Sequence, residues 1–254
     1  MKRTILTGVL VLTAGISGLL AQQPAAPAGT PKIKSPAEQT AVVAIQNAMD
    51  PDSQIKAAED LMTKFADTDF KEFALTVEAR AYQQKRDDVH AQVFGERVLA
   101  INPKSFSMEL LVGEVITGGI RDHDLDRDDK LAKANKLFND CIENTKTAVK
   151  PNPQITDAQW TEAMKYTVAE AHNGLGMLAS AQKKWDDAIK EYKLALDSDP
   201  EQDAYATRLA KVYLDTGKTA ECLAICDRLL AKPTLHPQIK AVVTNIKAAA
   251  SVNK

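Results

Sequence analysis

Cysteines are the residues of this chain whose spacing points most directly to chemistry, and the sequence has three: Cys141, Cys222 and Cys226. Cys222 and Cys226 are four residues apart, so on a helix they share one face. A disulfide between them would link a helix to itself, with a geometry that suits the bond poorly. A metal or redox site built on CxxxC is the alternative, but no second pair of ligands accompanies it. We interpret the pair as small buried side chains.

Alternating aspartates form a second candidate for chemistry, between positions 122 and 129: Asp122, Asp124, Asp126, Asp128 and Asp129. Carboxylates in such a pattern are ligands for hard cations such as calcium. However, Arg127 stands where an EF-hand loop requires glycine, and no glutamate closes a loop of about twelve residues. We therefore interpret the segment as the solvated start of a helix, whose dipole favours acidic side chains, and predict no ordered metal there.

Catalytic motifs are not found in the sequence. The four histidines stand apart from cysteine or carboxylate pairs at ligand spacing: His90, His123, His172 and His236. There is no nucleophile elbow and no phosphate-binding loop. The formal net charge is −2, or −4 without Lys2 and Arg3, so the chain lacks the excess of positive charge that is typical of nucleic-acid-binding proteins. We predict a protein that is not an enzyme, has no catalytic, metal-binding or cofactor-binding residues, and binds no nucleic acid.

The first 21 residues are typical of a secretory signal peptide. Lys2 and Arg3 precede an apolar run over residues 5–20, and Ala21 is a small residue at a plausible cleavage point. An uncleaved anchor is the alternative, although threonines and glycines make the run short and weak for a spanning helix. Residues 22–35 are rich in proline and alanine and indicate a linker. We expect an exported chain, periplasmic or secreted, with no membrane span after cleavage.

Helices are the elements that the composition favours. The chain is 44% hydrophobic but only 5% aromatic, which suits closely packed, alanine-rich helices. The helical pattern begins with Ser35 as a cap and Pro36 at the first helical position. Prolines then recur at the expected ends of helices, which they stop: Pro103, Pro151, Pro200 and Pro233. The order of these signals predicts a series of antiparallel helix pairs.

Residues 173–200 carry the clearest motif. Gly176 follows Leu175, and small, aromatic and helix-stopping residues come at fixed offsets after it: Ala188, Tyr192, Ala195 and Pro200. Small residues allow two helices of a pair to cross closely, and we expect Tyr192 to fill the space between one pair and the next. This spacing resembles the tetratricopeptide repeat, a helix–turn–helix unit of about 34 residues.

The resemblance extends in weaker form over residues 36–236. Ala79 takes the glycine position in the second unit and Gly113 in the third, where residues 117–130 form an insertion that we expect to be a loop within a helix pair. Other residues at the small, bulky and aromatic positions are Ala57 and Leu61 in the first unit, Tyr82, Ala91, Gly95 (beside Phe94) and Val98 in the second, Ala134, Phe138 and Cys141 in the third, and Leu209, Ala210, Tyr213, Cys222 and Cys226 in the fifth.

The resemblance implies an all-α fold, a tetratricopeptide-repeat solenoid of about eleven helices, in antiparallel pairs that form a right-handed superhelix. Residues 237–254 would be the capping helix that an open solenoid end needs. Thr156 and Gln159 form a capping box, which predicts a long helix from Asp157 to about Lys183. Trp160 on this helix is a candidate anchor for a partner or a second copy of the chain, or it covers the second helix of the third unit; both alternatives stay open.

The resemblance also implies where a ligand would bind, since repeats of this family usually bind on the concave face lined by the first helix of each pair. The exposed positions there are the candidate partner-binding residues: Arg80, Glu114, Asn173, Met177 and Lys211. The family's carboxylate clamp is not reproduced, because Asn173 and Lys211 alone are too few. The implied function is a non-enzymatic protein–protein interaction scaffold of the bacterial envelope, which binds a protein or peptide on this face or through the acidic insertion. The alternative is a self-associating structural scaffold.

Overall fold

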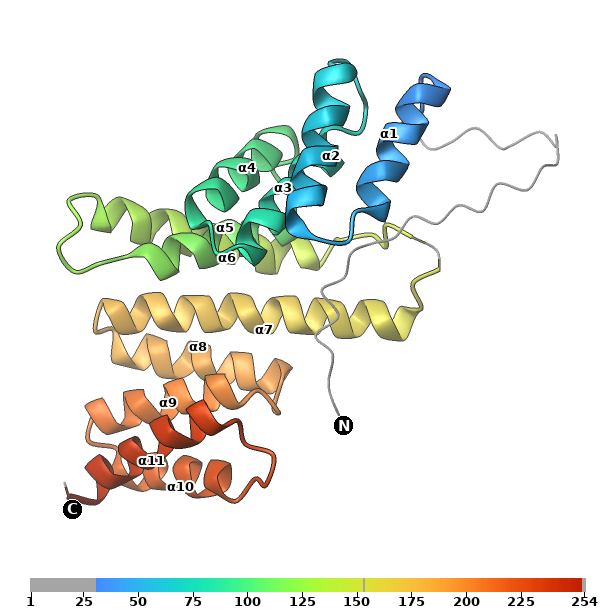
Figure 1. Cartoon of the computed structure of the whole chain (residues 1–254). Helices are drawn as coiled ribbons and strands as arrows, with labels where there is room; N and C mark the ends of the chain where they lie inside the picture. The colour runs from blue at the N-terminus through green and yellow to red at the C-terminus, as the bar shows by residue number, and fades with distance from the viewer. Residues whose placement is uncertain (1–30, 153, 253–254) are drawn as a thin grey trace. The chain divides into compact units, whose positions relative to one another are not determined.

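The structure, a computed structural model, describes residues 31–152 and 154–252, which form eleven α-helices and no strand (Figure 1). The expected all-α class is confirmed. The described residues divide into two compact units. The N-terminal unit comprises residues 31–103, 150–152, 154 and 155, and the C-terminal unit comprises residues 104–149 and 156–252. The expected signal peptide and most of the expected linker lie outside the described residues.

The N-terminal unit contains four helices: α1 (Pro36–Asn47), α2 (Pro51–Lys64), α3 (Lys71–Gln84) and α4 (Asp88–Ile101). Each helix packs against the next in the chain. The side chains of Ser35, Asp50 and Asp87 accept the backbone N–H three residues later and so cap α1, α2 and α4. The core of the first three helices consists of small and branched side chains: Val42, Ile45, Ala58, Leu61 and Ala74.

The C-terminal unit contains the remaining helices: α5 (Phe106–Gly119), α6 (Arg127–Thr145), α7 (Asp157–Ala181), α8 (Trp185–Ser198), α9 (Asp203–Asp215), α10 (Thr219–Leu230) and α11 (Pro237–Val252). Consecutive helices again pack against one another, and α11 also contacts α9. One hydrophobic cluster runs without interruption from Ala179 of α7 to Ala250 of α11, with Trp185 at its edge. The expected C-terminal capping helix is therefore present and closes this cluster.

Glycines allow the helices of the C-terminal unit to approach closely. A Cβ atom on Gly113 of α5 would lie 2.8 Å from the ring of Phe138 on α6, and one on Gly176 of α7 would lie 2.7 Å from the ring of Tyr192 on α8. The close approach expected at the small residues is confirmed, but the ring of Tyr192 lies against Gly176 of its own pair, whereas we expected it between one pair and the next. Tyr192 covers Gly176 of its own pair and also joins the cluster that continues into α9, so it fills more than the space between pairs.

Three expected boundaries differ from the structure. The insertion forms a loop only over residues 120–126, because α5 continues to Gly119 and α6 starts at Arg127. The hydroxyl of Thr117 donates to the carbonyl of Gly113, 2.7 Å away, within the last turns of α5. In the first unit Ala58, not Ala57, is the buried small residue beside Leu61. The helix α6 ends at Thr145 rather than near residue 149.

Helix α7 starts as expected. The Thr156 side chain accepts the N–H of Gln159, and the Gln159 side chain accepts the N–H of Thr156, so the capping box is complete. Trp160, in the first turn, packs edge-on against Phe106 of α5, with ring centroids 6.3 Å apart. It therefore contacts the first helix of the third unit, whereas one of our two alternatives placed it against the second helix. Trp160 stays partly exposed, so its role as an anchor remains a prediction.

Replacing Thr156 with alanine should remove the capping box and lower the free energy of unfolding by about 1 kcal/mol. Urea unfolding followed by tryptophan fluorescence measures this loss, because both tryptophans of the chain lie in the C-terminal unit. Thr161→Ala, at an exposed position in the second turn of the same helix, is the matched control and should leave stability unchanged or slightly raised. Equal losses in both variants would show that the cap contributes nothing.

Candidate functional site

The five expected partner-binding residues lie on the first helices of successive pairs. Arg80 is on α3 of the N-terminal unit, and the other four are in the C-terminal unit: Glu114 on α5, Asn173 and Met177 on α7, and Lys211 on α9. Asn173 and Met177 are one helical turn apart and lie on one face. Lys211 is exposed and forms an ion pair with Asp215, one turn further along α9. Their binding of a partner stays a prediction.

Asn173 is buried rather than exposed, and its surroundings include an arginine that sequence reasoning missed. The amide oxygen of Asn173 accepts a hydrogen bond from the Arg208 guanidinium at 3.1 Å. Its amide nitrogen lies 3.3 Å from a carboxylate oxygen of Glu170. Arg208 therefore connects α9, the first helix of the fifth repeat, to α7, the first helix of the fourth repeat. Its position on α9, one of the helices expected to line the binding face, was the only signal in the sequence.

Two aspartates of the acidic insertion form ion pairs with a lysine of the following helix. Lys130 of α6 forms ion pairs with Asp124 and Asp126, at 2.8 and 2.9 Å. The hydrogen bond from Lys130 lowers the pKa of Asp124 below its usual value. Arg127 donates to the carbonyl of Ala181, at the end of α7, at 2.7 Å. Across residues 31–152 and 154–252 no group of three or more His, Cys, Asp or Glu side chains is arranged to hold a metal ion.

The cysteines and His172 occupy structural positions. Cys141, Cys222 and Cys226 are buried and form no disulfide, as expected for small side chains in the core. Burial raises the pKa of the Cys141 and Cys226 thiols to about 12, so neither is a nucleophile at neutral pH. The ring Nδ1 of His172 on α7 lies 2.7 Å from a carboxylate oxygen of Glu191 on α8, and thus joins the two helices of one pair.

A groove in the N-terminal unit combines apolar and charged side chains. Its volume is about 430 Å³, and it lies between α2, α3 and α4. Apolar side chains and two charges of each sign line it; those that matter below are Glu59, Met62, Phe65, Glu78, Phe94 and Arg97. The ring of Phe94 stacks on Tyr82 with centroids 5.3 Å apart, and the Arg97 guanidinium lies 5.0 Å from the Phe94 centroid. A cation beside an aromatic face is a favourable arrangement.

Glu78 is the unusual residue of this groove. It is fully buried, and neither carboxylate oxygen has a hydrogen-bond partner. Burial raises its pKa to about 7, and the Glu59 charge adds to this, whereas the Arg97 charge opposes it. Glu78 stands just before the small residue Ala79, where the third, fourth and fifth units have Val112, Leu175 and Leu209. A charged residue in an aliphatic position was the signal that could have found it.

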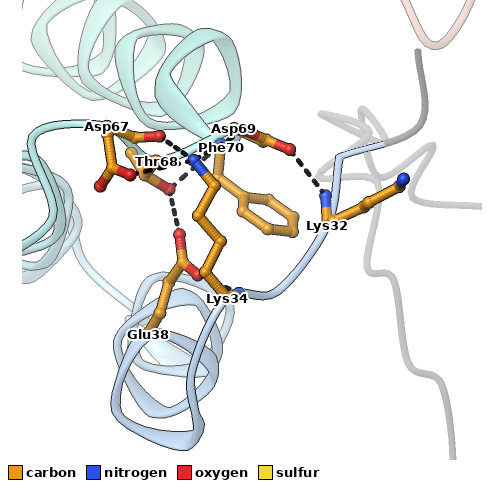
Figure 2. Close-up of polar contacts among 7 residues, drawn as sticks. All are labelled: Lys32, Lys34, Glu38, Asp67, Thr68, Asp69 and Phe70. Carbon is orange, nitrogen blue, oxygen red and sulfur yellow. Dashed lines mark hydrogen bonds and ion pairs between the residues drawn. The ribbon is translucent and has the colours of Figure 1, made fainter.

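The loop between α2 and α3 forms one end of the groove, and a polar cluster holds it in place (Figure 2). The buried carboxylate of Glu38 on α1 accepts the Thr68 hydroxyl at 2.7 Å. The Lys34 ammonium lies 3.1 Å from Asp69 and 3.3 Å from Asp67, and its hydrogen bond lowers the pKa of Asp69. Residues 32–34 are thereby fixed to the loop.

Replacing Thr68 with the isosteric valine should cost about 1–2 kcal/mol of unfolding free energy, because it leaves a buried oxygen of Glu38 without a donor. It also removes the acceptor of the Phe70 N–H, 3.2 Å from the hydroxyl. Amide hydrogen exchange over residues 66–72 together with thermal melting tests this. Thr63→Val on the exposed side of α2 is the matched control. Unchanged exchange in the Thr68 variant would contradict the assigned role of the cluster.

No helix in the described part of the chain is both long enough and apolar enough to cross a membrane.

Sequence comparisons relate the chain to proteins with the repeat described above. Residues 179–246 match the tetratricopeptide-repeat family model. Hsp70-Hsp90 organizing protein 3 of Arabidopsis thaliana is 30% identical over 87 residues, which are 32% of this chain and 16% of that protein. Hsp70-Hsp90 organizing protein 2 of Arabidopsis thaliana is 36% identical over 58 residues, 23% of this chain and 10% of that protein. The matched segments thus span less than a fifth of these curated relatives.

Solved structures extend the likeness along most of the chain. A thermophilic TPR protein of Thermus thermophilus has a TM-score of 0.54 at 17% identity, over 82% of this chain and 98% of that one. A MamA double mutant has a TM-score of 0.53 at 11% identity, over 87% of this chain and 99% of that one. At such identities the likeness concerns the fold alone. Together with the family match over residues 179–246 and the packing of Gly176 against Tyr192, it shows that the chain has a fold similar to that of tetratricopeptide-repeat proteins.

Proposed function

We propose that this chain is a non-enzymatic scaffold for protein–protein interactions, which binds a protein or peptide on the surface formed by the first helices of its repeats. The single observation that carries the proposal is the tetratricopeptide-repeat architecture, in which small and aromatic residues such as Gly176 and Tyr192 pack where the helices cross. Stacked helix pairs of this kind create extended surfaces that such proteins use for binding. The similarity to Hsp70-Hsp90 organizing proteins, whose name describes the organisation of other proteins, supports the same class of function.

The chemistry of that surface supports a polar partner. Lys211 keeps over half of its side chain exposed despite its ion pair with Asp215. Arg208 adds a guanidinium, one of whose N–H groups already donates a hydrogen bond to the amide oxygen of Asn173. A partner with carboxylate or backbone carbonyl groups would find donors there, from Arg208 and Lys211. The surface offers no thiol with a lowered pKa, since burial raises the pKa of Cys141 and Cys226.

Export to the bacterial periplasm or to the outside is part of the same proposal. It rests on the sequence of the first 21 residues, with Lys2 and Arg3 before an apolar run that ends near Ala21. Expression of the full-length chain with a C-terminal tag in a Gram-negative host tests it. We expect a tagged product in the periplasmic fraction that begins near residue 22 by N-terminal sequencing. An uncut product in the membrane fraction would favour an anchor, and an uncut cytoplasmic product would exclude export.

A comparative pull-down tests the binding surface. The tagged chain is incubated with envelope extract beside a variant in which Arg80, Glu114 and Lys211 are alanine. A Glu143→Gln variant, on the second helix α6, serves as the control for a change of surface charge. We expect a partner that wild type and control retain and the triple variant loses, with all three proteins equally folded by circular dichroism. Retention by all three would place the interaction elsewhere on the chain.

Self-association is the alternative function, and light scattering of the purified chain separates it from partner binding. A monomer at micromolar concentration would exclude a self-assembling scaffold. Oligomers that dissociate when Trp160 is replaced by alanine would support it, because this partly exposed tryptophan is the side chain proposed as an anchor for a second copy.

A further inference from the structure

The groove between α2, α3 and α4 contains a buried carboxylate that the packing of the repeat does not use. Glu78 lines the groove from α3, and each of its oxygens exposes less than 1 Å² and has no hydrogen-bond partner. An unpaired buried acceptor is costly, so most such groups in native proteins have a donor from protein, water or ligand. The aliphatic residues that other units place here, Leu175 and Leu209, would avoid this cost. The glutamate is therefore the feature of the groove that indicates a ligand.

The groove's walls suit an aliphatic chain. Met62 and Phe65, from α2 and the residue after it, and Phe94 of α4 are all partly buried and line the groove. Methionine has a flexible side chain that repacks easily around a guest. The volume of about 430 Å³ falls in the range of ligand pockets. Because the Glu78 oxygens are buried, a ligand reaches them only when side chains of the groove wall move.

The charges around Glu78 come from every helix that forms the groove. Glu59 on α2 adds a second negative charge, whereas Lys71 on α3 and Arg97 on α4 are positive. Arg97 makes no hydrogen bond to the Glu78 oxygens and instead places its guanidinium over the Phe94 ring. The two acids of the groove are matched by two basic residues, but neither basic residue donates a hydrogen bond to the Glu78 oxygens. A further cationic donor from a ligand would satisfy them.

We propose that this groove is a docking pocket for the side chain of a lysine in a bound polypeptide, whose ammonium pairs with Glu78. Its four-carbon stem lies between Met62, Phe65 and Phe94, and its three N–H donors face the carboxylates of Glu78 and Glu59. Lysine fits better than arginine, because a compact ammonium on a flexible stem suits a narrow apolar wall, whereas the guanidinium site over Phe94 is already taken by Arg97. The pocket is formed by the second helices α2 and α4 together with Glu78 and Lys71 of the first helix α3, and none of the five residues of the proposed first-helix surface lines it.

Methyl NMR tests the proposal on the full-length chain. The sequence has only six methionines, so the Met62 methyl signal can be assigned by Met62→Leu. The probe is the blocked peptide Ala-Ala-Lys-Ala-Ala, and the same peptide with norleucine in place of lysine is its uncharged match. We expect the lysine peptide to shift the Met62 signal in a saturable way and the norleucine peptide to leave it unchanged. In Glu78→Gln the affinity should fall about tenfold or more.

Two further variants separate loss of the carboxylate from loss of the fold. Thr63→Trp, at an exposed position that lines the groove, should block the pocket while Glu78 stays intact. Glu143→Gln, in the C-terminal unit, should bind as wild type does. Equal shifts with both peptides, no shift with either, or unchanged affinity in Glu78→Gln would overturn the proposal. Binding of n-butylammonium without binding of the lysine peptide would also overturn it, in favour of a small amine. Each of these outcomes leaves the first-helix surface untouched.

Discussion

Replacing Gly174 with alanine is expected to lower the free energy of unfolding by about 2–3 kcal/mol, at the upper end of the range for overpacked cores. A Cβ atom at this position would lie 2.3 Å from Cζ of Phe138 and 2.6 Å from two further ring carbons. These distances are far below van der Waals contact, so the ring or the helix must move.

Phe138 has little room to move away. Its side chain is fully buried, and the same ring also lies against Gly113 of α5, where an added Cβ would be only 2.8 Å away. Two glycines from two different helices thus contact the ring closely. Alanine gains about 1 kcal/mol over glycine in helix propensity, and the estimate above is net of that gain.

Urea unfolding followed by tryptophan fluorescence measures the effect, with Gly118→Ala as the matched control. Gly118 is also in a helix of the C-terminal unit, but a Cβ there would meet nothing within 4 Å, so the control should be neutral or stabilised. The double variant Gly174→Ala with Phe138→Leu should show a smaller loss than the sum of the two single losses, because the smaller side chain relieves the clash. Additive losses would mean that Phe138 does not set the cost.

Replacing Glu78 with leucine is expected to stabilise the chain by about 3 kcal/mol more at pH 8 than at pH 4.5 or below. The pKa of this carboxyl is raised from 4.5 to about 7 in the folded state. Below pH 4.5 the group is protonated in both the folded and the unfolded chain, and its charge costs nothing. Between pH 4.5 and 7 the unfolded chain loses the proton while the folded chain keeps it, so stability falls by about 1.4 kcal/mol per pH unit.

The measurement is the difference in unfolding free energy between variant and wild type, from urea unfolding by circular dichroism at pH 5, 6, 7 and 8. Taking the difference removes the similar contribution of Glu109, whose pKa burial also raises. Glu78→Gln should flatten the pH dependence in the same way without filling the position with an aliphatic side chain. Glu59→Gln, an exposed acid on the same groove, is the control and should change little. A difference that does not grow with pH would show that Glu78 is paired in solution.

Local signals explain which parts of the fold the sequence predicts well. The capping box of Thr156 and Gln159 and the helix start at Pro237 act within four residues, so the start of α7 and the extent of α11 were predicted almost to the residue. The fixed offsets of the repeat predicted Gly113 and Gly176 at close helix crossings, but not that Phe138 and Tyr192 are the side chains that lie against them. The loop of residues 120–126 was overestimated because helix α5 continues through two glycines, Gly118 and Gly119.

Contacts between residues that are far apart in the sequence were harder to predict. Gly174 faces Phe138, which is 36 positions earlier, and the repeat motif assigns no role to the residue two before its glycine. The bond from Arg208 to Asn173 and the bond from Thr68 to Glu38 likewise join residues that only the fold brings together. The candidate site shows the same limit: the five first-helix residues were identified by position, whereas Glu78 was overlooked in a position reserved for packing.

Site-specific photo-crosslinking tests the central claim, that a polypeptide binds the first-helix surface, most directly. A benzophenone amino acid replaces Lys211 on α9 in one protein and Lys193, an exposed residue on the second helix α8, in the other. Both are irradiated in cells that express the full-length chain, and adducts are identified by mass spectrometry. We predict a protein adduct from position 211 that position 193 does not give. Equal adducts from both positions, or none from 211 while 193 gives one, would contradict the account.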